Sequence, residues 1–336
     1  MTRADQLKSL LASHLQGEDE RFMAIAMQVA AHEAKRGHTK LAAELQAVID
    51  KGKMHRQRLV FNVDKVSPIS YKNRELAGLL HITHPKARLG TMVLHQTLLK
   101  QLERVIREQQ QAIKILAHGL QPRRKLLLMG PPGTGKTMTA SVLAGELGLP
   151  LLQIRLDSLI TKYMGETSAR LRQVFDVTSQ TRGLYFFDEF DAIGSQRGLT
   201  NDVGEVRRIL NSFLQMIEQE ESHSLILAAT NHPEILDPAL FRRFDDVLCY
   251  QLPDQSDIIS ILISRLKPVI RKRVSWKRLA RNAEGLSHAE VIRAADEVLK
   301  KALLDDHLRI SEVDIRQSLE ERRQIIQQLT TLPKED

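Results

Sequence analysis

The octapeptide GPPGTGKT at residues 130–137 contains the residue types that hold the phosphates of a nucleoside triphosphate. It fits the pattern Gly-x4-Gly-Lys-Ser/Thr without a mismatch, and its glycines let the loop curl so that backbone N–H groups point at the anion. Lys136 has the length to reach the β- and γ-phosphates, and Thr137 offers a hydroxyl to Mg²⁺. We therefore expect a nucleoside triphosphate and Mg²⁺ to bind at this loop. The predicted nucleotide-binding residues of this loop are Pro132, Gly133, Thr134, Gly135, Lys136, Thr137 and Met138.

Two adjacent carboxylates follow an apolar run at residues 183–187. Ligands of parallel sheets bind at the carboxyl ends of the strands, so Asp188 and Glu189 are expected beside the phosphate loop. Asp188 is predicted to hold Mg²⁺ through its water shell, and Glu189 to orient or deprotonate the attacking water. Asn231 follows the next apolar run and is a candidate for contact with the γ-phosphate, although Asn-His-Pro is also a good turn sequence. The acids extend the prediction from nucleotide binding to hydrolysis.

Short apolar runs alternate with segments of helical spacing around these residues. Residues 125–129 precede the phosphate loop and residues 139–147 have helical periodicity, so the loop is expected to join a strand to a helix. Further strand-like runs occupy residues 151–155, 183–187 and 225–229. Continuous apolar strands that alternate with helices predict an α/β fold of the P-loop NTPase type, with a parallel sheet sandwiched by helices.

The periodicity of the chain divides it into four zones. Residues 1–50 carry three short amphipathic stripes, which predict an N-terminal helical bundle that recognises a substrate or partner. Residues 51–86 lack a pattern and are interpreted as a linker with room for one short strand or helix. Residues 87–252 form the predicted large α/β domain, in which residues 92–116 are expected to make one long helix. Residues 253–336 are predicted to form a small all-α lid domain.

Composition narrows the class of protein. The chain has 336 residues, of which 42% are hydrophobic and 27% charged, as in ordinary globular proteins. No apolar run approaches the ~18 residues that span a bilayer, and the first residues lack the apolar core of a signal peptide. The single cysteine, Cys249, excludes an internal disulfide framework and is expected to be a buried, inert thiol because its neighbours are strand-like. These features predict a cytoplasmic protein without membrane contact.

The net charge of +8 raises the question of nucleic acid. The densest basic stretch, residues 265–281, contains only Trp276 as an aromatic residue, and aromatic residues make up 4% of the chain. Binders of single strands interleave basic and aromatic side chains. A solvated basic helix is therefore favoured over a nucleic-acid site, and an ATPase linked to nucleic acid is kept as an alternative.

Five segments, in their order and spacing, resemble the motifs of the AAA ATPases, the ring-forming branch of the AAA+ superfamily that includes protein unfoldases and remodelling factors. They are GPPGTGKT, FFDEFDAIG (186–194), AATN (228–231), LDPALFRRFDD (236–246) and GLSHAEV (285–291). The resemblance covers about residues 115–336. It implies that the catalytic residues are Glu189, Asn231 as the first sensor, and the pair Arg242 and Arg243, which reach into the site of a neighbouring subunit. A guanidinium matches two phosphate oxygens, and an arginine supplied in this way accelerates phosphoryl transfer by ~10³-fold or more. The resemblance therefore implies a homo-oligomer, a hexameric ring.

The same resemblance assigns the residues around the nucleoside. His288 and Ala289 match the lid segment that contacts adenine and ribose. His288 stands where many family members have glycine, and Ala289 stands at the position of a second-sensor arginine, which the AAA subgroup usually lacks. Gly119 and Leu120 match the other wall of the adenine pocket.

A loop that lines the central pore is also implied. Tyr163, Met164 and Gly165 match its aromatic, apolar and glycine positions, and residues 201–208 match a second pore loop. Tyr and Met supply contact area that tolerates many sequences, so these residues are expected to grip a polypeptide substrate. An exposed tyrosine at the start of a helix is the simpler alternative.

These expectations combine into a ring-forming ATPase, with ATP and Mg²⁺ as its cofactors, that remodels or unfolds a protein through a central pore. A finer resemblance is to bacterial AAA proteins encoded beside subtilisin-like serine proteases in anti-phage cassettes, which would imply a separate protease partner. An ATP-controlled assembly switch or scaffold that threads no substrate is the second alternative.

Overall fold

A computed structural model describes residues 78–159, 164–190, 203–236, 241–267, 269–270, 274–304 and 310–331, together with residues 25–27, 29–30 and 42. Met1–Val66 and Ser67–Asp336 form two compact units, and the fold below is that of the second unit. Most of the predicted N-terminal bundle lies outside the described residues. Tyr163 lies outside them as well, whereas Met164 and Gly165 begin a helix.

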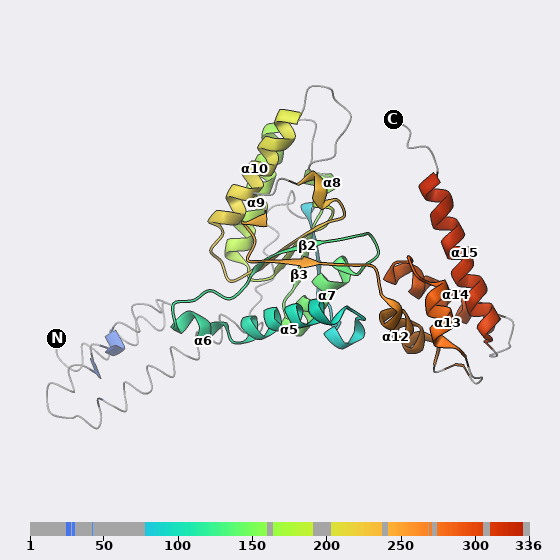
Figure 1. The fold of residues 1–336 in the computed structure, drawn as a ribbon. Coiled ribbons are helices and arrows are strands. Elements are labelled where there is room, and N and C mark those ends of the chain that lie inside the picture. Colours follow the sequence, from blue (N-terminus) through green and yellow to red (C-terminus); the bar gives the residue numbers. More distant parts are fainter. Residues whose placement is uncertain are drawn as a thin grey trace. The chain divides into compact units, whose positions relative to one another are not determined.

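A six-stranded sheet forms the centre of the large domain (Figure 1). Its strands follow the order β1-β3-β4-β5-β2-β6. Every neighbouring pair is parallel except β1 with β3. The strands are β1 (Leu80–Thr83), β2 (Lys125–Met129), β3 (Leu151–Ile154), β4 (Leu184–Phe187), β5 (Leu225–Thr230) and β6 (Asp246–Cys249). The predicted α/β class with a mostly parallel sheet is therefore confirmed.

Helices cover both faces of this sheet, which is why its central strands are apolar along their whole length. Helices α9 and α10 lie on one face, and α5, α6 and α7 lie on the other (Figure 1). The helices of the large domain are α5 (Gln96–Gln110), α6 (Ala112–Ala117), α7 (Lys136–Leu147), α8 (Leu156–Leu159), α9 (Met164–Gln180) and α10 (Val203–Gln219).

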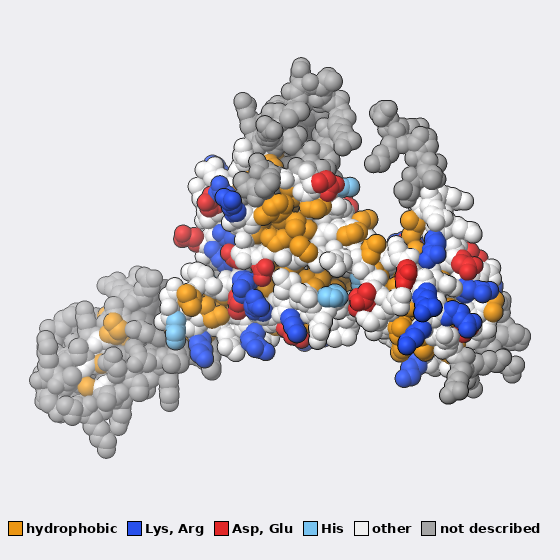
Figure 2. All heavy atoms as spheres, viewed as in Figure 1, with side chains coloured by type: hydrophobic (Ala, Val, Ile, Leu, Met, Phe, Trp, Pro, Cys, Tyr) orange, Lys and Arg blue, Asp and Glu red, His pale blue; other side chains and the backbone are white. Residues whose placement is uncertain are grey.

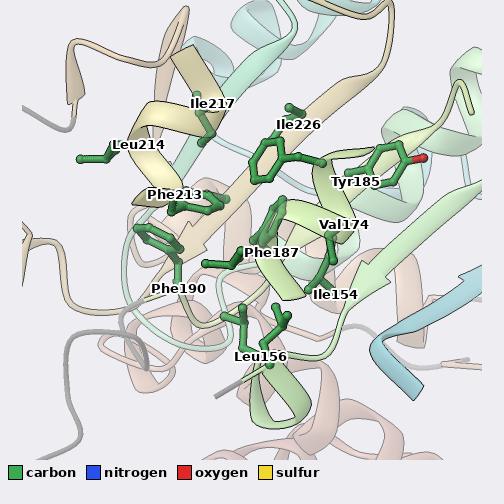
Figure 3. Packing of buried hydrophobic residues seen from close by; sticks show 14 of the residues in the cluster. Ile154, Leu156, Val174, Tyr185, Phe187, Phe190, Phe213, Leu214, Ile217 and Ile226 are labelled. Atoms are coloured by element: carbon green, nitrogen blue, oxygen red, sulfur yellow. The ribbon is translucent and has the colours of Figure 1, made fainter. Parts of the chain in front are cut away.

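Aromatic rings fill the core between β4 and the helices α9 and α10 (Figure 3). The Phe213 ring meets the Phe187 ring edge-on at a centroid distance of 4.9 Å and lies 4.4 Å from the Phe190 ring. Phe175 contacts the rings of Phe187 and Phe213. Because Phe187 directly precedes the two acids of the site, this packing fixes the end of β4 from which they project.

In the described part of residues 253–331, four helices form the small domain around a core of its own. They are α12 (Gln255–Leu266), α13 (Trp276–Asn282), α14 (His288–Leu304) and α15 (Glu312–Thr331). The first begins with a capping box, in which the Asp254 side chain accepts a hydrogen bond from the backbone of Asp257 and the reverse bond is also made. None of the described helices is both long and apolar enough to cross a membrane.

Three local expectations differ from the structure. The strand β1 lies inside the predicted linker and pairs with β3, so the sheet of the large domain begins before residue 87. The expected helix at 92–116 starts only at Gln96, because the His95 side chain caps it, and it breaks at Gln111. Cys249 is exposed rather than buried, since it ends β6, the strand at one edge of the sheet.

Candidate nucleotide-binding site

The phosphate loop joins β2 to α7 in the predicted order. Gly130 has a positive φ of 146° and lies so close to the next segment that a Cβ there would meet the Tyr250 carbonyl oxygen at 2.3 Å. Only glycine fits such a position. Gly135, with φ 105°, caps α7 without a side chain, so the N–H groups of the first helical turn keep their capacity to bind an anion.

Lys136 is buried within this loop. Its ammonium donates hydrogen bonds of 2.7 Å to the carbonyl of Gly130 and 2.8 Å to that of Pro131. The Thr134 hydroxyl also donates to Pro131, at 2.7 Å. These bonds keep the cationic head beside the loop backbone, where the phosphates of a triphosphate are expected.

Thr137 and Asp188 meet across the site. The Thr137 hydroxyl donates to Asp188 Oδ2 at 2.8 Å, and the backbone N–H of Glu189 donates to Asp188 Oδ1 at 3.0 Å. Both oxygens of the carboxylate are thereby oriented. Hydroxyl and carboxylate oxygens are ligands that Mg²⁺ accepts together with phosphate and water oxygens. Among the described residues no group of three or more His, Cys, Asp and Glu side chains gathers as a metal site.

Glu189 has an unusual backbone. Its φ of 50° is the only positive φ found for a non-glycine residue in the described part of the chain. A left-handed conformation costs a residue with a Cβ roughly 1–2 kcal/mol, and such strain concentrates at functional sites. The turn directs the chain away from β4 at the point where the two acids occur.

A cavity of about 420 Å³ connects these residues, a size within the range of small-ligand sites. Asp188, Glu189 and Asn231 line it together because β4 and β5 are parallel neighbours and their carboxyl ends lie at one edge of the sheet. The cavity also includes the predicted residues Pro132, Gly133, Thr134, Gly135, Lys136, Thr137 and Met138 of the phosphate loop.

The small domain closes the cavity from the other side. His288 and Ala289 line it, and the Ala289 N–H donates to the Gly133 carbonyl at 3.0 Å. The other lining residues from this domain are Ile261, Ser264, Arg265 and Ile292. Burial lowers the pKa of His288 below its ordinary value, while the nearby Asp257 acts in the opposite direction. The imidazole is therefore neutral at physiological pH.

The structure does not bring Gly119 and Leu120, the residues expected at the adenine pocket, to this cavity. Neither lines the cavity, and Leu120 is exposed. The physical reason is the direction of β2. These residues precede its first residue, whereas the phosphate loop follows its last, so a strand of about 13 Å separates them.

Thr91, Met92 and Val93 line the cavity instead. Sequence reasoning missed them because it placed Met92 and Val93 inside a long helix. The available signals were Gly90, which interrupts that pattern, and the capping residue His95.

Arg242 and Arg243 do not line this cavity. They precede β6 and lie near the start of β2, where the Asp245 carboxylate accepts hydrogen bonds of 2.8 Å from the N–H groups of Arg124 and Lys125. Arg243 forms an ion pair with Glu218 at the end of α10. The two arginines thus lie at the end of the sheet where β2 begins, whereas the phosphate loop follows the last residue of β2. Within one chain they do not reach the site.

A parallel sheet, a glycine-rich phosphate loop and two acids on the neighbouring strand define this molecule as a P-loop nucleoside triphosphatase. Comparison with known proteins gives the family. The family described as "ATPase family associated with various cellular activities (AAA)" matches residues 126–252. Over 323 residues the chain is 33% identical to an uncharacterized AAA family ATPase, y4kL, of Sinorhizobium fredii, and the match covers 96% of both chains. The chain therefore belongs to the AAA family of ATPases.

Two other relatives match over part of their length. Protein SAV of Sulfolobus acidocaldarius is 38% identical over 179 residues, which are 52% of this chain and 23% of that protein. The ATP-dependent zinc metalloprotease FtsH of Helicobacter felis is 29% identical over 252 residues, which are 72% of this chain and 40% of that protein. The similarity to both is thus confined to less than half of each relative.

Proposed function

We propose that this protein hydrolyses ATP in a ring of identical subunits and uses the energy to remodel or unfold a polypeptide. The observation that carries the catalytic part is the arrangement around Asp188, whose two oxygens are held by Thr137 and by the backbone of Glu189 inside the cavity. Thr137 and Asp188 would hold Mg²⁺, which would neutralise charge on the phosphates. Glu189 accepts a proton from the attacking water, and Asn231 orients that water or the γ-phosphate.

The proposed ring follows from the position of the arginines. Arg242 and Arg243 lie away from the cavity of their own chain, at the end of the sheet where β2 begins. An arginine finger acts on a γ-phosphate by direct contact. In the proposed assembly, which we take to be a hexamer in the cytoplasm, these arginines complete the site of the next subunit.

A polypeptide is the proposed substrate, and Tyr163, Met164 and Gly165 are the proposed pore loop. A relative that is named as an ATP-dependent metalloprotease supports coupling of this type of domain to protein turnover. We further propose that a separate protease, of the subtilisin type and in an anti-phage system, receives the unfolded chain. The assembly switch and the nucleic-acid-linked ATPase are the competing functions.

The charge distribution supports polypeptide over nucleic acid. On the face seen in Figure 2, Lys and Arg side chains are interspersed with Asp and Glu side chains over both described domains. Nucleic-acid sites in contrast gather their basic side chains into one patch or stripe.

The test measures ATP turnover by the full chain with Mg²⁺, alone and with an unfolded protein, with DNA or with RNA. We expect stimulation by the unfolded protein, loss of turnover in Lys136→Ala, and loss of stimulation with normal basal turnover in Tyr163→Ala. Turnover no greater than that of Lys136→Ala would overturn the ATPase itself. Salt-dependent stimulation by nucleic acid alone would favour the nucleic-acid function. Stimulation by the unfolded protein that is unchanged in Tyr163→Ala would count against threading and favour the switch.

A further inference from the structure

The segment between β1 and α5 is hydrogen-bonded to a carboxylate in the last turn of α7. Glu146 Oε1 accepts a bond of 2.8 Å from the backbone N–H of Leu89, and Glu146 Oε2 accepts one of 3.1 Å from Arg88 Nη1. Arg88 Nη1 also donates to the Gly145 carbonyl at 3.1 Å. A carboxylate in the last turn of a helix lies at the negative end of the helix dipole, so these two donors offset an otherwise unfavourable position.

The same contact brings two backbones close together. A Cβ on Gly145 would lie 2.3 Å from the carbonyl oxygen of Ala87, so only glycine permits this approach. Leu89 then begins the short 3₁₀ helix η2 (Leu89–Thr91), and the Met92 N–H donates to the Leu89 carbonyl at 3.0 Å. The place of Met92 thus follows from the end of the turn that α7 holds.

The residues at the end of this turn form one wall of the cavity and contact the small domain. Thr91, Met92 and Val93 line the cavity, and Val93 packs against the core of the small domain. The Met92 side chain reaches the phosphate loop, since a Cβ on Gly135 would lie 3.2 Å from Met92 Cε. Glu146 itself does not line the cavity. Its effect on a bound nucleotide is therefore expected to pass through this wall.

The chemistry of the wall suits a nucleoside rather than phosphates. Met92 and Val93 are apolar, as are Ile261 and Ile292, which line the cavity from the small domain. A flat base packs on apolar surface, whereas phosphates are expected at Lys136 and at the N–H groups of the loop. Displacement of the wall should therefore affect the nucleoside part of a ligand and not its phosphates.

We propose that Glu146, together with Arg88, is a positioning residue that holds residues 91–93 in place for the nucleoside, while the phosphate loop binds the triphosphate independently of it. The inference rests on the proposed function, because it presupposes a nucleotide in this cavity. A wall that is in place for only part of the time lowers the apparent affinity by that fraction. Loss of the Glu146 carboxylate should therefore weaken the binding of ATP but not that of a triphosphate without a nucleoside.

The experiment measures the Kd of the full-length protein for ATP and for inorganic tripolyphosphate, each with Mg²⁺, by calorimetry. Wild type is compared with Glu146→Ala and with Glu146→Gln, which keeps an acceptor for the Leu89 N–H. We expect Glu146→Ala to raise the Kd for ATP roughly three- to tenfold, the range of one hydrogen bond, with the Kd for tripolyphosphate unchanged. Glu146→Gln should raise it less. Glu320→Ala on α15 is the matched control, because Glu320 also pairs with an arginine and lies outside the cavity.

Arg88→Ala repeats the test with little risk to folding, because 61% of that side chain is exposed. It should weaken the binding of ATP alone, as Glu146→Ala does, but by a smaller factor. A double-mutant cycle then tests the route of action. Met92→Ala removes part of the wall, so Glu146→Ala should add less in that background than in wild type.

Fully additive effects of Met92→Ala and Glu146→Ala would overturn the inference. So would an unchanged Kd for ATP in Glu146→Ala, or a Kd for tripolyphosphate that rises as much as that for ATP. Wild type that binds ATP but not tripolyphosphate would contradict independent binding of the phosphates, and the inference with it. Wild type that binds neither ligand would overturn the proposed function itself.

Discussion

The hydroxyl of Thr137 donates a 2.8 Å hydrogen bond to the carboxylate of Asp188, a residue 51 positions later in the chain. Thr137 follows the first residue of α7, and Asp188 follows the last residue of β4. The bond therefore joins the phosphate loop to the end of the strand that Glu189, the proposed catalytic base, follows. It holds side by side two oxygen atoms of types that can bind Mg²⁺.

Thr137→Val tests the metal role of this pair, since it removes the hydroxyl at nearly constant volume. We expect the Kd for ATP measured with Mg²⁺ to rise roughly 10- to 100-fold, as for the loss of a bond to a charged group. The Kd measured in EDTA is expected to change little. Thr97→Val, an exposed threonine on α5, is the control. Equal weakening with and without the metal would show that Thr137 acts through packing rather than through Mg²⁺.

Glu189→Gln tests the assigned base. The amide keeps the shape of the side chain but does not accept a proton, so turnover should fall about 10²- to 10⁴-fold while ATP binding is retained. Steady-state phosphate release and a separate binding titration measure the two effects. Glu234→Gln, an exposed acid on the turn after β5, is the control. Normal turnover by Glu189→Gln would remove this residue from its role.

Arg243→Ala tests the shared site. Its ion pair with Glu218 is partly solvent-exposed, at 37% and 61% of the two side chains, so only a modest loss of stability is expected. We expect turnover to fall about 10³-fold with ATP affinity nearly unchanged. Arg316→Ala on α15 is the matched control, because that arginine also forms an exposed ion pair.

Mixing Arg243→Ala with Lys136→Ala subunits separates action within a chain from action between chains. Each variant is inactive alone, but a mixed interface contains one intact phosphate loop and one intact arginine. Partial recovery of turnover is the expected result. If no mixing ratio restores activity, the arginine does not act across an interface.

Phe213→Ala tests the aromatic core behind β4. The side chain is fully buried against Phe187 and Phe190, so its loss should lower the free energy of unfolding by about 3–5 kcal/mol. Urea denaturation followed by circular dichroism measures this. Leu304→Ala, at 84% exposure, should change it by less than about 0.5 kcal/mol. Similar losses in both variants would contradict the packing in Figure 3.

Two histidines predict a dependence of stability on pH. Burial lowers the pKa of His288 and of His223, and for His223 the charges of Arg182 and Arg124 lower it further. The unfolded chain then binds protons at a higher pH than the folded chain. The stability that these two neutral side chains contribute is fully present above the ordinary pKa of 6.5. It is lost as the pH falls toward their lowered pKa values in the folded protein.

Urea midpoints at pH 7.5 and 5.5 check this sign. Wild type should lose stability between the two, and His223→Gln and His288→Gln should each lose less. A loss in the two variants as large as that of wild type would show that these histidines do not titrate differently in the folded state.

Local residue patterns were sufficient to predict the central strands of the sheet and the residues of the phosphate loop and of the turn after β4. The apolar runs became β2 to β5, because a strand covered on both faces must be apolar along its length. GPPGTGKT and the acids after β4 were identified without coordinates, because a phosphate loop and the ends of adjacent parallel strands impose fixed residue types. The family resemblance is confirmed as far as the AAA family itself.

Other parts depended on contacts between segments far apart in the chain. One wall of the cavity is formed by Thr91, Met92 and Val93 and not by Gly119 and Leu120. The reasons are the direction of β2 and the cap at His95, where the helix begins only after residue 93. The short strand β1 joins the sheet because it pairs with β3. The residue composition of β1 alone does not predict this pairing.

The sequence by itself therefore determined the class of chemistry, since phosphate binding and proton transfer demand particular side chains at particular spacings. Only the tertiary structure decided which residues line the cavity, and placed Arg243 beside Glu218 at the end of the sheet away from the phosphate loop. The physical reason is that these features depend on how strands and helices pack in space, and spacing along the chain does not encode that packing.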